Sequence, residues 1–225
     1  MEVNEKLLSK EKDSEFKRIK GLTWLPWVGT NYFQLDHRIL IIAESHYQTP
    51  GESIEKDDSI TRKVVQIYAI PRDKPAAMFE NLYRCLFATN DINRELLWSN
   101  IAFYNFVQRP MPTIKSRPNE QDFHMGWKVF VDIVKNLKPT ECIFVGVEAT
   151  KFFNDNMYKL GIPYNSVQRL KLENLRRYAR QFSIVLNDTT IPCVAIQHTS
   201  HHFSWKSWNV FLQKGYNEIL KDLQK

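Results

Sequence analysis

The chain has 225 residues, of which 43% are hydrophobic and 25% charged, and its net charge is +6. This composition is that of an ordinary globular protein, and it excludes a disordered chain, a collagen-like chain and a small disulfide scaffold. No apolar run approaches the roughly 20 residues that span a bilayer, and the charged N-terminal stretch has no signal-peptide core. We therefore expect a soluble, cytoplasmic protein without a membrane partner. Its positive charge is compatible with a polyanionic partner.

The predicted elements alternate between strands and helices. Residues 2–19 are mostly charged and predict an exposed polar helix, which forms an N-terminal extension over residues 1–20. Apolar periodicity then predicts, in chain order, a strand over 38–43, helices over 59–68 and 75–88, a strand over 96–107, a helix over 122–137, a strand over 141–147, a short helix over 148–156, strands over 181–186 and 191–198, and a closing helix over 205–223. This alternation is typical of an α/β protein with a mostly parallel sheet.

The three cysteines do not predict a metal centre. Cys85, Cys142 and Cys193 lie far apart in the sequence, without the CxxC spacing of zinc or redox sites. The last two lie in apolar runs, where a cysteine usually acts as a small buried hydrophobe. We therefore expect neither a structural zinc nor an iron–sulfur cluster.

Polar side chains stand at the carboxyl ends of several predicted strands, where ligands of parallel sheets bind. Glu44 follows the first strand, Asn105 lies near the end of the second, and His198 ends the last. We therefore expect a carboxylate, an amide and an imidazole to share one edge of the sheet. No glycine-rich phosphate loop is present, and a nucleotide-cofactor enzyme is therefore disfavoured.

These segments, in this order, resemble the uracil-DNA glycosylase superfamily. Residues 43–47 (AESHY) occupy the place of the water-activating motif, written GQDPYH in one branch and GEAPG in another. Residues 104–110 (YNFVQRP) are similar to the base-reading segment TNVVKCRPP, and residues 137–149 (LKPTECIFVGVEA) look like IRPKVIVALGATA. Residues 198–200 (HTS) correspond to the closing HPS motif. The resemblance covers residues 22–210 and is closest to a branch with a GESHY-like first motif.

The resemblance implies a three-layer α/β/α sandwich over residues 21–225, with a central, mostly parallel sheet of four strands. Three departures separate this chain from the better-known branches. Ser45 replaces the aspartate of GQDPYH, Thr199 replaces the proline of HPS, and the four cluster cysteines of the GEAPG branch are absent. The preferred base therefore need not be uracil.

The resemblance implies catalytic roles for Glu44 and His198. Cleavage of a pyrimidine–deoxyribose bond leaves an oxocarbenium-like sugar and an anionic base. Glu44 would stabilise the sugar cation and orient the attacking water, and His198 would donate a hydrogen bond to O2 of the leaving base. The plainer interpretations are a solvated or helix-capping glutamate and a hydrogen-bonded structural histidine.

Four residues are candidates for binding the base. Asn105 can present an acceptor and two donors to a base edge, and it lies nearer the end of its strand than its rival Asn100. Phe79 is the candidate stacking platform, although a core aromatic is the plainer interpretation. Tyr47 would line the C5 side of a pyrimidine, and His46 is the fourth candidate.

A base must leave the stack to reach such a pocket, and an apolar wedge fills the gap it leaves. Phe203 is the predicted wedge, with core packing as the plainer interpretation. The other candidates for DNA binding are Ser200, His202, Arg109, Lys206, Arg176 and Arg177. The last two belong to a basic run over residues 169–180, for which a solvated surface is the plainer interpretation.

We expect no metal site, because His202 and its neighbour His201 would point in different directions on an extended loop. The sequence thus predicts a monofunctional DNA glycosylase that needs no cofactor. It would hydrolyse the N-glycosidic bond of a flipped-out uracil or modified pyrimidine and leave an abasic site. The partner would be single- or double-stranded DNA, bound by a monomer, in base-excision repair or in defence against modified phage DNA.

Two alternatives remain open. The first is a catalytically inert, nucleic-acid-binding relative of the same fold, because fold does not fix function. The second is a hydrolase of free nucleosides or another small substrate.

Overall fold

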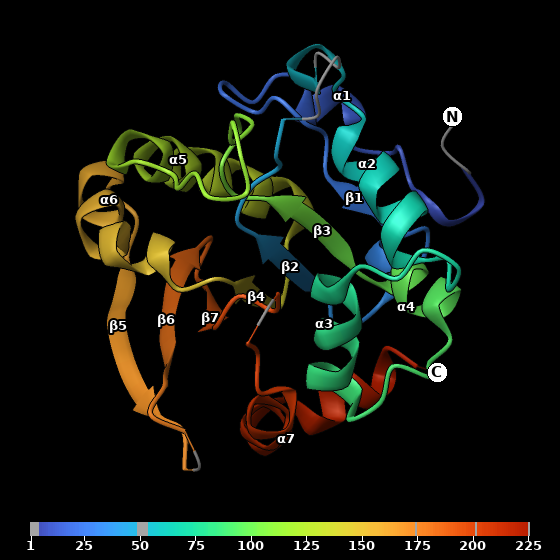
Figure 1. The fold of residues 1–225 in the computed structure, drawn as a ribbon. Helices are drawn as coiled ribbons and strands as arrows, with labels where there is room; N and C mark the ends of the chain where they lie inside the picture. Colours follow the sequence, from blue (N-terminus) through green and yellow to red (C-terminus); the bar gives the residue numbers. More distant parts are fainter. Residues whose placement is uncertain (1–4, 49–53, 174, 201, 225) are drawn as a thin grey trace.

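The computed structural model describes residues 5–48, 54–173, 175–200 and 202–224, and it shows one mixed sheet flanked by helices (Figure 1). Its strands are β1 (Trp27–Val28), β2 (Ile39–Ala43), β3 (Ala102–Asn105), β4 (Glu141–Val145), β5 (Tyr164–Lys171), β6 (Tyr178–Leu186) and β7 (Thr189–Ile196). Its α-helices are α1 (Asp13–Phe16), α2 (Ile60–Val64), α3 (Ala77–Phe87), α4 (Arg94–Asn100), α5 (Glu120–Leu137), α6 (Phe153–Leu160) and α7 (Trp205–Asp222). Shorter helical turns are η1 (Glu5–Leu7), η2 (Tyr32–Gln34), η3 (Ile54–Lys56), the π-helical η4 (Val65–Ala69) and η5 (Glu148–Phe152).

The strands lie in the order β1-β3-β2-β4-β7-β6-β5, so the α/β class is confirmed. The four neighbours β3, β2, β4 and β7 are parallel, whereas β1 at one side and β6 and β5 at the other run antiparallel. The described sheet therefore has seven strands, and the expected count of four is corrected. The two unpredicted strands lack a strong signal: β1 has two residues, and most β5 side chains face solvent.

Each face of the sheet carries its own hydrophobic core, because successive side chains of a strand point to opposite faces. Leu40 and Ile42 pack in one cluster, and Ile39 and Ile41 in the other. Helices α5 and α6 lie on one side of the sheet and α3 and α7 on the other (Figure 1). The predicted helices over 75–88, 122–137 and 205–223 are confirmed as α3, α5 and α7.

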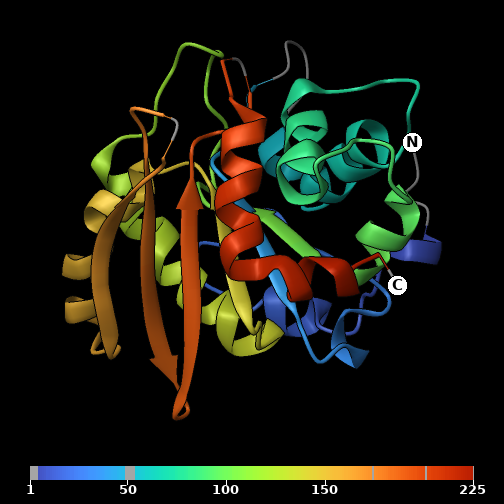
Figure 2. The ribbon, with the colours of Figure 1, turned by 90° about the horizontal axis from the view of Figure 1, so that it is seen from below.

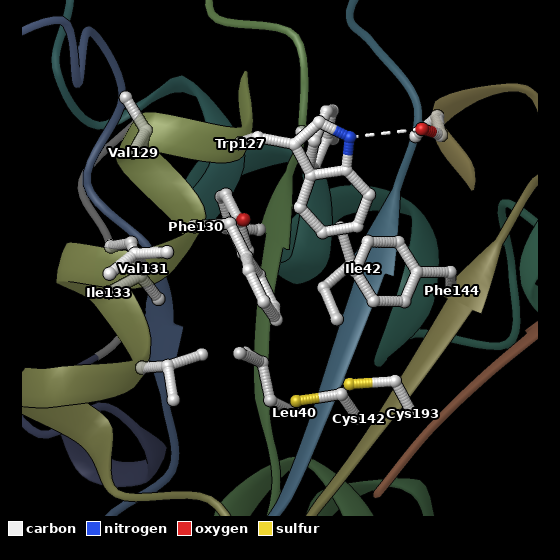
Figure 3. Close-up of a cluster of buried hydrophobic side chains, with 14 of the residues drawn as sticks. Leu40, Ile42, Trp127, Val129, Phe130, Val131, Ile133, Cys142, Phe144 and Cys193 are labelled. Atoms are coloured by element: carbon white, nitrogen blue, oxygen red, sulfur yellow. Dashed lines mark hydrogen bonds between the residues drawn. The ribbon is translucent and has the colours of Figure 1, made fainter. Parts of the chain in front are cut away.

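Trp127 of α5 is at the centre of one of these cores (Figure 3). Its ring packs against Phe130 and Phe144, and its Nε1 donates a hydrogen bond of 2.9 Å to the carbonyl of Ala149. At the lower end of the same cluster, Cys142 and Cys193 face each other across β4 and β7. The three cysteines are free and buried, which confirms the prediction of burial for Cys142 and Cys193.

Two predicted elements are wrong in detail. Residues 96–107 were expected to be one strand, but α4 extends to Asn100 and only then does β3 begin. The reason is a helix cap: the Asn93 side chain accepts a hydrogen bond of 3.0 Å from the backbone of Leu96. The apolar residues that follow fit a helical face as well as a strand.

The N-terminal segment is not a single exposed helix. Within its described residues it contains only η1 and the four-residue α1. Leu8 pairs with Gly29 beside β1, Phe16 is buried in the core, and Arg62 binds Asp13 with two hydrogen bonds of 2.9 and 2.5 Å. The segment therefore packs as part of the globular body.

The parallel strands β2, β3, β4 and β7 end at one edge of the sheet, which we call the carboxyl edge. Because β6 is antiparallel to β7, the turn between β5 and β6 reaches the same edge. Figure 2 shows this edge at the top of the view, with the β5–β6 turn and the segments after β3 and β7. No helix among the described residues is long and apolar enough to cross a membrane.

Candidate active site at the carboxyl edge

Asn105, Glu44 and His198 stand at the ends of three strands of the parallel set, as the sequence predicted. Asn105 ends β3 directly opposite Ala43, so Glu44 is the next residue along β2. The backbone of Val107 donates a hydrogen bond of 2.9 Å to the Glu44 carbonyl. His198 follows β7, which pairs with β4 on the other side of β2.

Glu44 is half-buried beside Gly146, the residue that follows β4. Burial raises the pKa of its carboxyl, Arg117 acts in the opposite direction, and Glu148 adds to the increase. Gly146 has a φ of +142°, and a Cβ there would lie 3.4 Å from Glu44 Oε2. The glycine thus leaves room for the carboxylate at the end of the sheet.

The hollow next to Glu44 is small. It is lined by the aromatic residues Phe106, Phe123 and Phe144 together with Ala149 and neighbouring backbone. Its volume of about 10 Å³ is close to what one water molecule requires. A pyrimidine would therefore need surrounding side chains to move before it could occupy this hollow.

His198 is held as a neutral imidazole with its proton on Nε2. Its Nδ1 accepts a hydrogen bond of 3.2 Å from the Ser200 backbone N–H and lies 3.0 Å from the Ser200 hydroxyl. Burial lowers its pKa, and the nearby Arg117 lowers it further. The geometry leaves Nε2–H as the group that can donate to a ligand.

The loop that carries His198 is fastened to α3. Thr199 is buried, and its hydroxyl donates a hydrogen bond of 2.8 Å to the Met78 carbonyl. Asn81 donates from Nδ2 to the carbonyls of Thr199 and Ser200, at 2.8 and 3.1 Å. Thr199 therefore has a structural use, because its hydroxyl anchors the loop.

Asn105 is buried and already paired with His46. Its Nδ2 lies 2.6 Å from His46 Nε2, which is also 2.9 Å from the Thr61 hydroxyl. Burial lowers the pKa of His46 to about 4, so the imidazole is neutral at neutral pH. Trp24 packs edge-on against the same ring, which fixes the ring between the two polar partners.

The rival amide, Asn100, lies at the other end of β3. Its Oδ1 accepts a hydrogen bond of 3.0 Å from Asn31, and its Nδ2 donates one of 3.2 Å to the Leu223 carbonyl. These contacts assign it a structural role at the junction of α4 and β3. Of the two amides, Asn105 is the one at the carboxyl edge.

Tyr47 and Phe79 differ sharply in their surroundings. Tyr47 is 41% exposed and pairs with Met111, so the segments after β2 and β3 run side by side. Phe79 is 2% exposed and packs against Trp98 and Phe103 in the core. A base cannot stack on a ring enclosed in this way, and the prediction of Phe79 as a platform is therefore corrected.

Phe203 and Arg109 are also engaged elsewhere. The Phe203 ring is partly buried and lies parallel to Trp208 of α7, with an interplanar angle of 6°. Arg109 binds Asp122, at the start of α5, through two hydrogen bonds of 2.5 and 2.6 Å. Phe203 would have to leave this stack to enter DNA, whereas the Arg109 side chain is 45% exposed and uses only Nε and Nη2 to bind Asp122.

The remaining predicted DNA-binding residues lie around the same edge. Ser200 supports His198, His202 is exposed with a φ of +59°, and the Lys206 ammonium lies 5.6 Å from the ring centre of Trp205. Arg176 and Arg177 are exposed in the β5–β6 turn. They are thus on the side of the molecule that carries Glu44 and His198.

Sequence reasoning missed Arg117, which lies in the segment between β3 and α5. Its guanidinium is exposed, yet its charge lowers the pKa values of both Glu44 and His198. The residue belongs to a proline-rich loop without periodicity, so only its closeness to the two strand ends in the fold identifies it.

Among the described residues, no group of three or more histidine, cysteine, aspartate or glutamate side chains could hold a metal ion. His201, which the sequence placed beside His202, lies outside the described residues. A scan against models of protein families gives no match for this chain, and a search of curated proteins gives none either.

Proposed function

We propose that this protein is a monofunctional DNA glycosylase that hydrolyses the N-glycosidic bond of a flipped-out uracil or modified pyrimidine. The observation that supports this most is the position of Glu44, Asn105 and His198 on neighbouring parallel strands at one edge. In this proposal, the parallel strands β3-β2-β4-β7 are the central sheet of a uracil-DNA glycosylase-like fold. The antiparallel strands β1, β6 and β5 are additions to it.

Glu44 would act on the sugar. When ionised, its carboxylate stabilises the developing positive charge at C1′ and orients a water for attack. The water oxygen bonds to C1′ as the bond from C1′ to N1 of the base breaks, and the electron pair leaves with the base. The proton lost by the water passes to the carboxylate or to solvent.

His198 would act on the leaving base. Its Nε2–H points away from the Ser200 contacts on Nδ1 and can donate to the anionic O2. A neutral donor suits this task because it stabilises the anion without transferring a proton. Arg117 would favour the same anion by its charge.

Asn105 would read the base. Because its Nδ2 is engaged by His46, its Oδ1 is the acceptor available to a ligand. An acceptor at this point favours a base that presents an N–H donor on its Watson–Crick edge. The basic residues Arg176, Arg177 and Lys206 would bind phosphates, which positions DNA without reading its sequence.

The test is release of free base from a panel of oligonucleotides. The panel contains uracil, hydroxymethylcytosine and glucosylated cytosine, each in single- and double-stranded DNA, with wild type compared with Glu44→Gln and His198→Ala. Wild type should release at least one of these bases, Glu44→Gln should release none, and His198→Ala should be about 10²- to 10³-fold slower. Release that is unchanged in Glu44→Gln would contradict the proposal.

A second function is favoured by two observations. The hollow beside Glu44 holds about one water molecule, and the Asn105 amide is already paired, as in a protein that binds nucleic acid without accepting a base. Oligonucleotide binding that weakens steeply with salt, without base release by wild type, would support this inert relative over the glycosylase.

A further inference from the structure

A cavity of about 450 Å³ lies at the edge of the sheet where β2, β4 and β7 begin, which we call the amino edge. Its walls come from the residue before β2, from the end of α5 with the segment that leads to β4, and from the turn between β6 and β7. Figure 2 shows this turn at the bottom of the view, at the far end of the strands from the carboxyl edge. Sites for small molecules commonly have volumes of about 300–1,000 Å³, so an organic ligand fits here.

The charged side chains that line this cavity are all cations, namely Arg38, Lys135 and Lys138. Of these, Lys135 is paired on its own helix, with its Nζ 3.0 Å from Asp132. Arg38 and Lys138 have no carboxylate within ion-pair distance in the part of the chain that the structure describes. They come from different segments, and their charges are available to an anion.

The carboxylates nearest in sequence do not line the cavity. Glu141 begins β4, is buried, and accepts a hydrogen bond from the Thr140 hydroxyl. Asp188 is exposed in the β6–β7 turn and is absent from the lining. The cavity wall is therefore positively charged, although Glu141 lies behind it.

The Arg38 guanidinium is held in a fixed position. Its Nε donates a hydrogen bond of 2.8 Å to the Lys138 carbonyl, and its Nη1 donates one of 3.1 Å to the Leu35 carbonyl. A guanidinium has five N–H groups, so two are used here and the others have no partner among the described residues. An arginine fixed in this way is suited to bind two oxygens of one phosphate group.

Lys138 is fixed by its backbone. Its φ is +49°, a conformation in which glycine is the usual residue after a helix. Its N–H donates a hydrogen bond of 2.8 Å to the Val134 carbonyl, and its own carbonyl accepts from Arg38. The two cations are thus joined directly, and the lysine is present where a glycine would fit with less strain.

The rest of the lining suits the body of an organic molecule. Val134 and Ile191 are buried core residues whose edges reach the cavity, and Pro139 adds a third apolar side chain. Asn187 and Thr190 contribute polar groups from the β6–β7 turn. Inorganic phosphate would use only the cations, whereas a larger phosphate ester would also cover the apolar side chains.

We propose that this cavity binds a small organic phosphate, a phosphate monoester with an apolar or planar body. Arg38 and Lys138 bind the phosphate, and Val134, Pro139 and Ile191 contact the body of the ligand. The site is separate from the candidate active site, since the two lie at opposite edges of the sheet. This inference goes beyond the proposed function and does not depend on it, so each can fail without the other.

The test is calorimetric titration of the full chain with adenosine monophosphate, a probe whose purine differs from the pyrimidines proposed for the active site. Wild type should bind it with a Kd below about 1 mM. Adenosine, which lacks the phosphate, and inorganic phosphate, which lacks the apolar body, should each bind at least tenfold more weakly. No binding of adenosine monophosphate, or equal affinity for adenosine, would overturn the proposal.

The variants separate loss of the site from loss of the fold. Lys138→Gln and Lys138→Gly should each weaken binding of adenosine monophosphate at least fivefold, and Lys138→Gly should keep or raise the melting temperature because glycine relieves the positive φ. The matched control is Lys128→Gln, an exposed lysine on the same helix that does not line the cavity. It should change the Kd less than twofold. Equal loss in Lys128→Gln and Lys138→Gln would reduce the effect to net charge and overturn the site.

A competition experiment distinguishes a free phosphate ester from DNA as the source of the phosphate. Saturation of the protein with a short duplex should leave the Kd for adenosine monophosphate unchanged, because DNA would bind at the carboxyl edge. Loss of binding in the presence of the duplex, together with weaker duplex binding by Lys138→Gln, would assign these cations to DNA and overturn the small-molecule site.

Discussion

The amide nitrogen of Asn105 lies 2.6 Å from Nε2 of His46, and this contact joins the segment after β2 to the end of β3. Both side chains are buried, and Thr61 and Trp24 fix the imidazole from other sides. The orientation of the proposed base-reading amide therefore depends on a neutral histidine. This dependence makes the site sensitive to acid.

The first prediction concerns stability at low pH. His46 has a pKa of about 4 in the folded protein and an ordinary value near 6.5 when unfolded, so the unfolded chain binds more protons between these pH values. The free energy of unfolding should therefore fall by up to about 3 kcal/mol as the pH drops from 6.5 to 4. Denaturant titrations of His46→Gln should lack most of this fall, whereas His37→Gln should retain it. An equal fall in both variants would contradict the assignment.

The second prediction concerns Glu44 and has the opposite sign. Because burial raises its pKa, the folded protein binds more protons in the window above the ordinary value of 4.5, and stability falls as pH rises through that window. Glu44→Gln removes the buried charge and should raise the melting temperature at pH 7.5, with little change at pH 4. A lower melting temperature at pH 7.5 would show that the carboxylate is favourably paired.

The third prediction concerns the anchor of the His198 loop. Thr199→Val keeps the shape of the side chain but leaves the Met78 carbonyl without its hydrogen bond, at a cost of about 1–3 kcal/mol of stability. If the loop positions His198, kcat for base release should fall about tenfold while KM changes little. Thr189→Val, at the exposed start of β7, is the control and should change neither. A Thr199→Val enzyme that is less stable but equally fast would limit the threonine to a structural role.

The fourth prediction concerns the β5–β6 turn. The double variant Arg176→Ala/Arg177→Ala should weaken binding to all sequences of B-DNA. It should also lower the slope of log K against log salt by about 0.9 for each phosphate that the variant no longer neutralises. Lys135→Ala/Lys159→Ala removes the same charge from α5 and α6 and serves as the control. Equal effects of the two double variants would mean that net charge alone, rather than this turn, binds DNA.

Much of the fold was predictable because its central strands are continuous apolar runs. Ile39–Ala43 and Glu141–Val145 are buried on both faces of the sheet, and this burial leaves an unambiguous pattern in the sequence. Residues 96–107 were misassigned to a single strand because their apolar residues fit both the helical and the strand periodicity. The helix cap at Asn93 was also overlooked. Strand β5 carries no apolar run and was missed for that reason.

The positions of the candidate residues could be predicted where they end strands, and could not be predicted where side-chain packing decides. Glu44, Asn105 and His198 could be placed because parallel strands end at a common edge. Phe79 could not, because an aromatic residue on a helix gives no sign of whether it faces the core or a ligand. Arg117 was missed because its position depends on how a loop folds back over the strand ends.

The most direct test of this account is to measure free base and abasic sites together after incubation of wild type with duplex DNA that contains uracil or a modified pyrimidine. The account predicts equal amounts of the two products, formed by wild type and not by Glu44→Gln. It also predicts that activity falls as pH is lowered, because Glu44 must be ionised and His198 neutral. Abasic sites formed equally by Glu44→Gln, or no products with any pyrimidine despite salt-dependent binding, would contradict it.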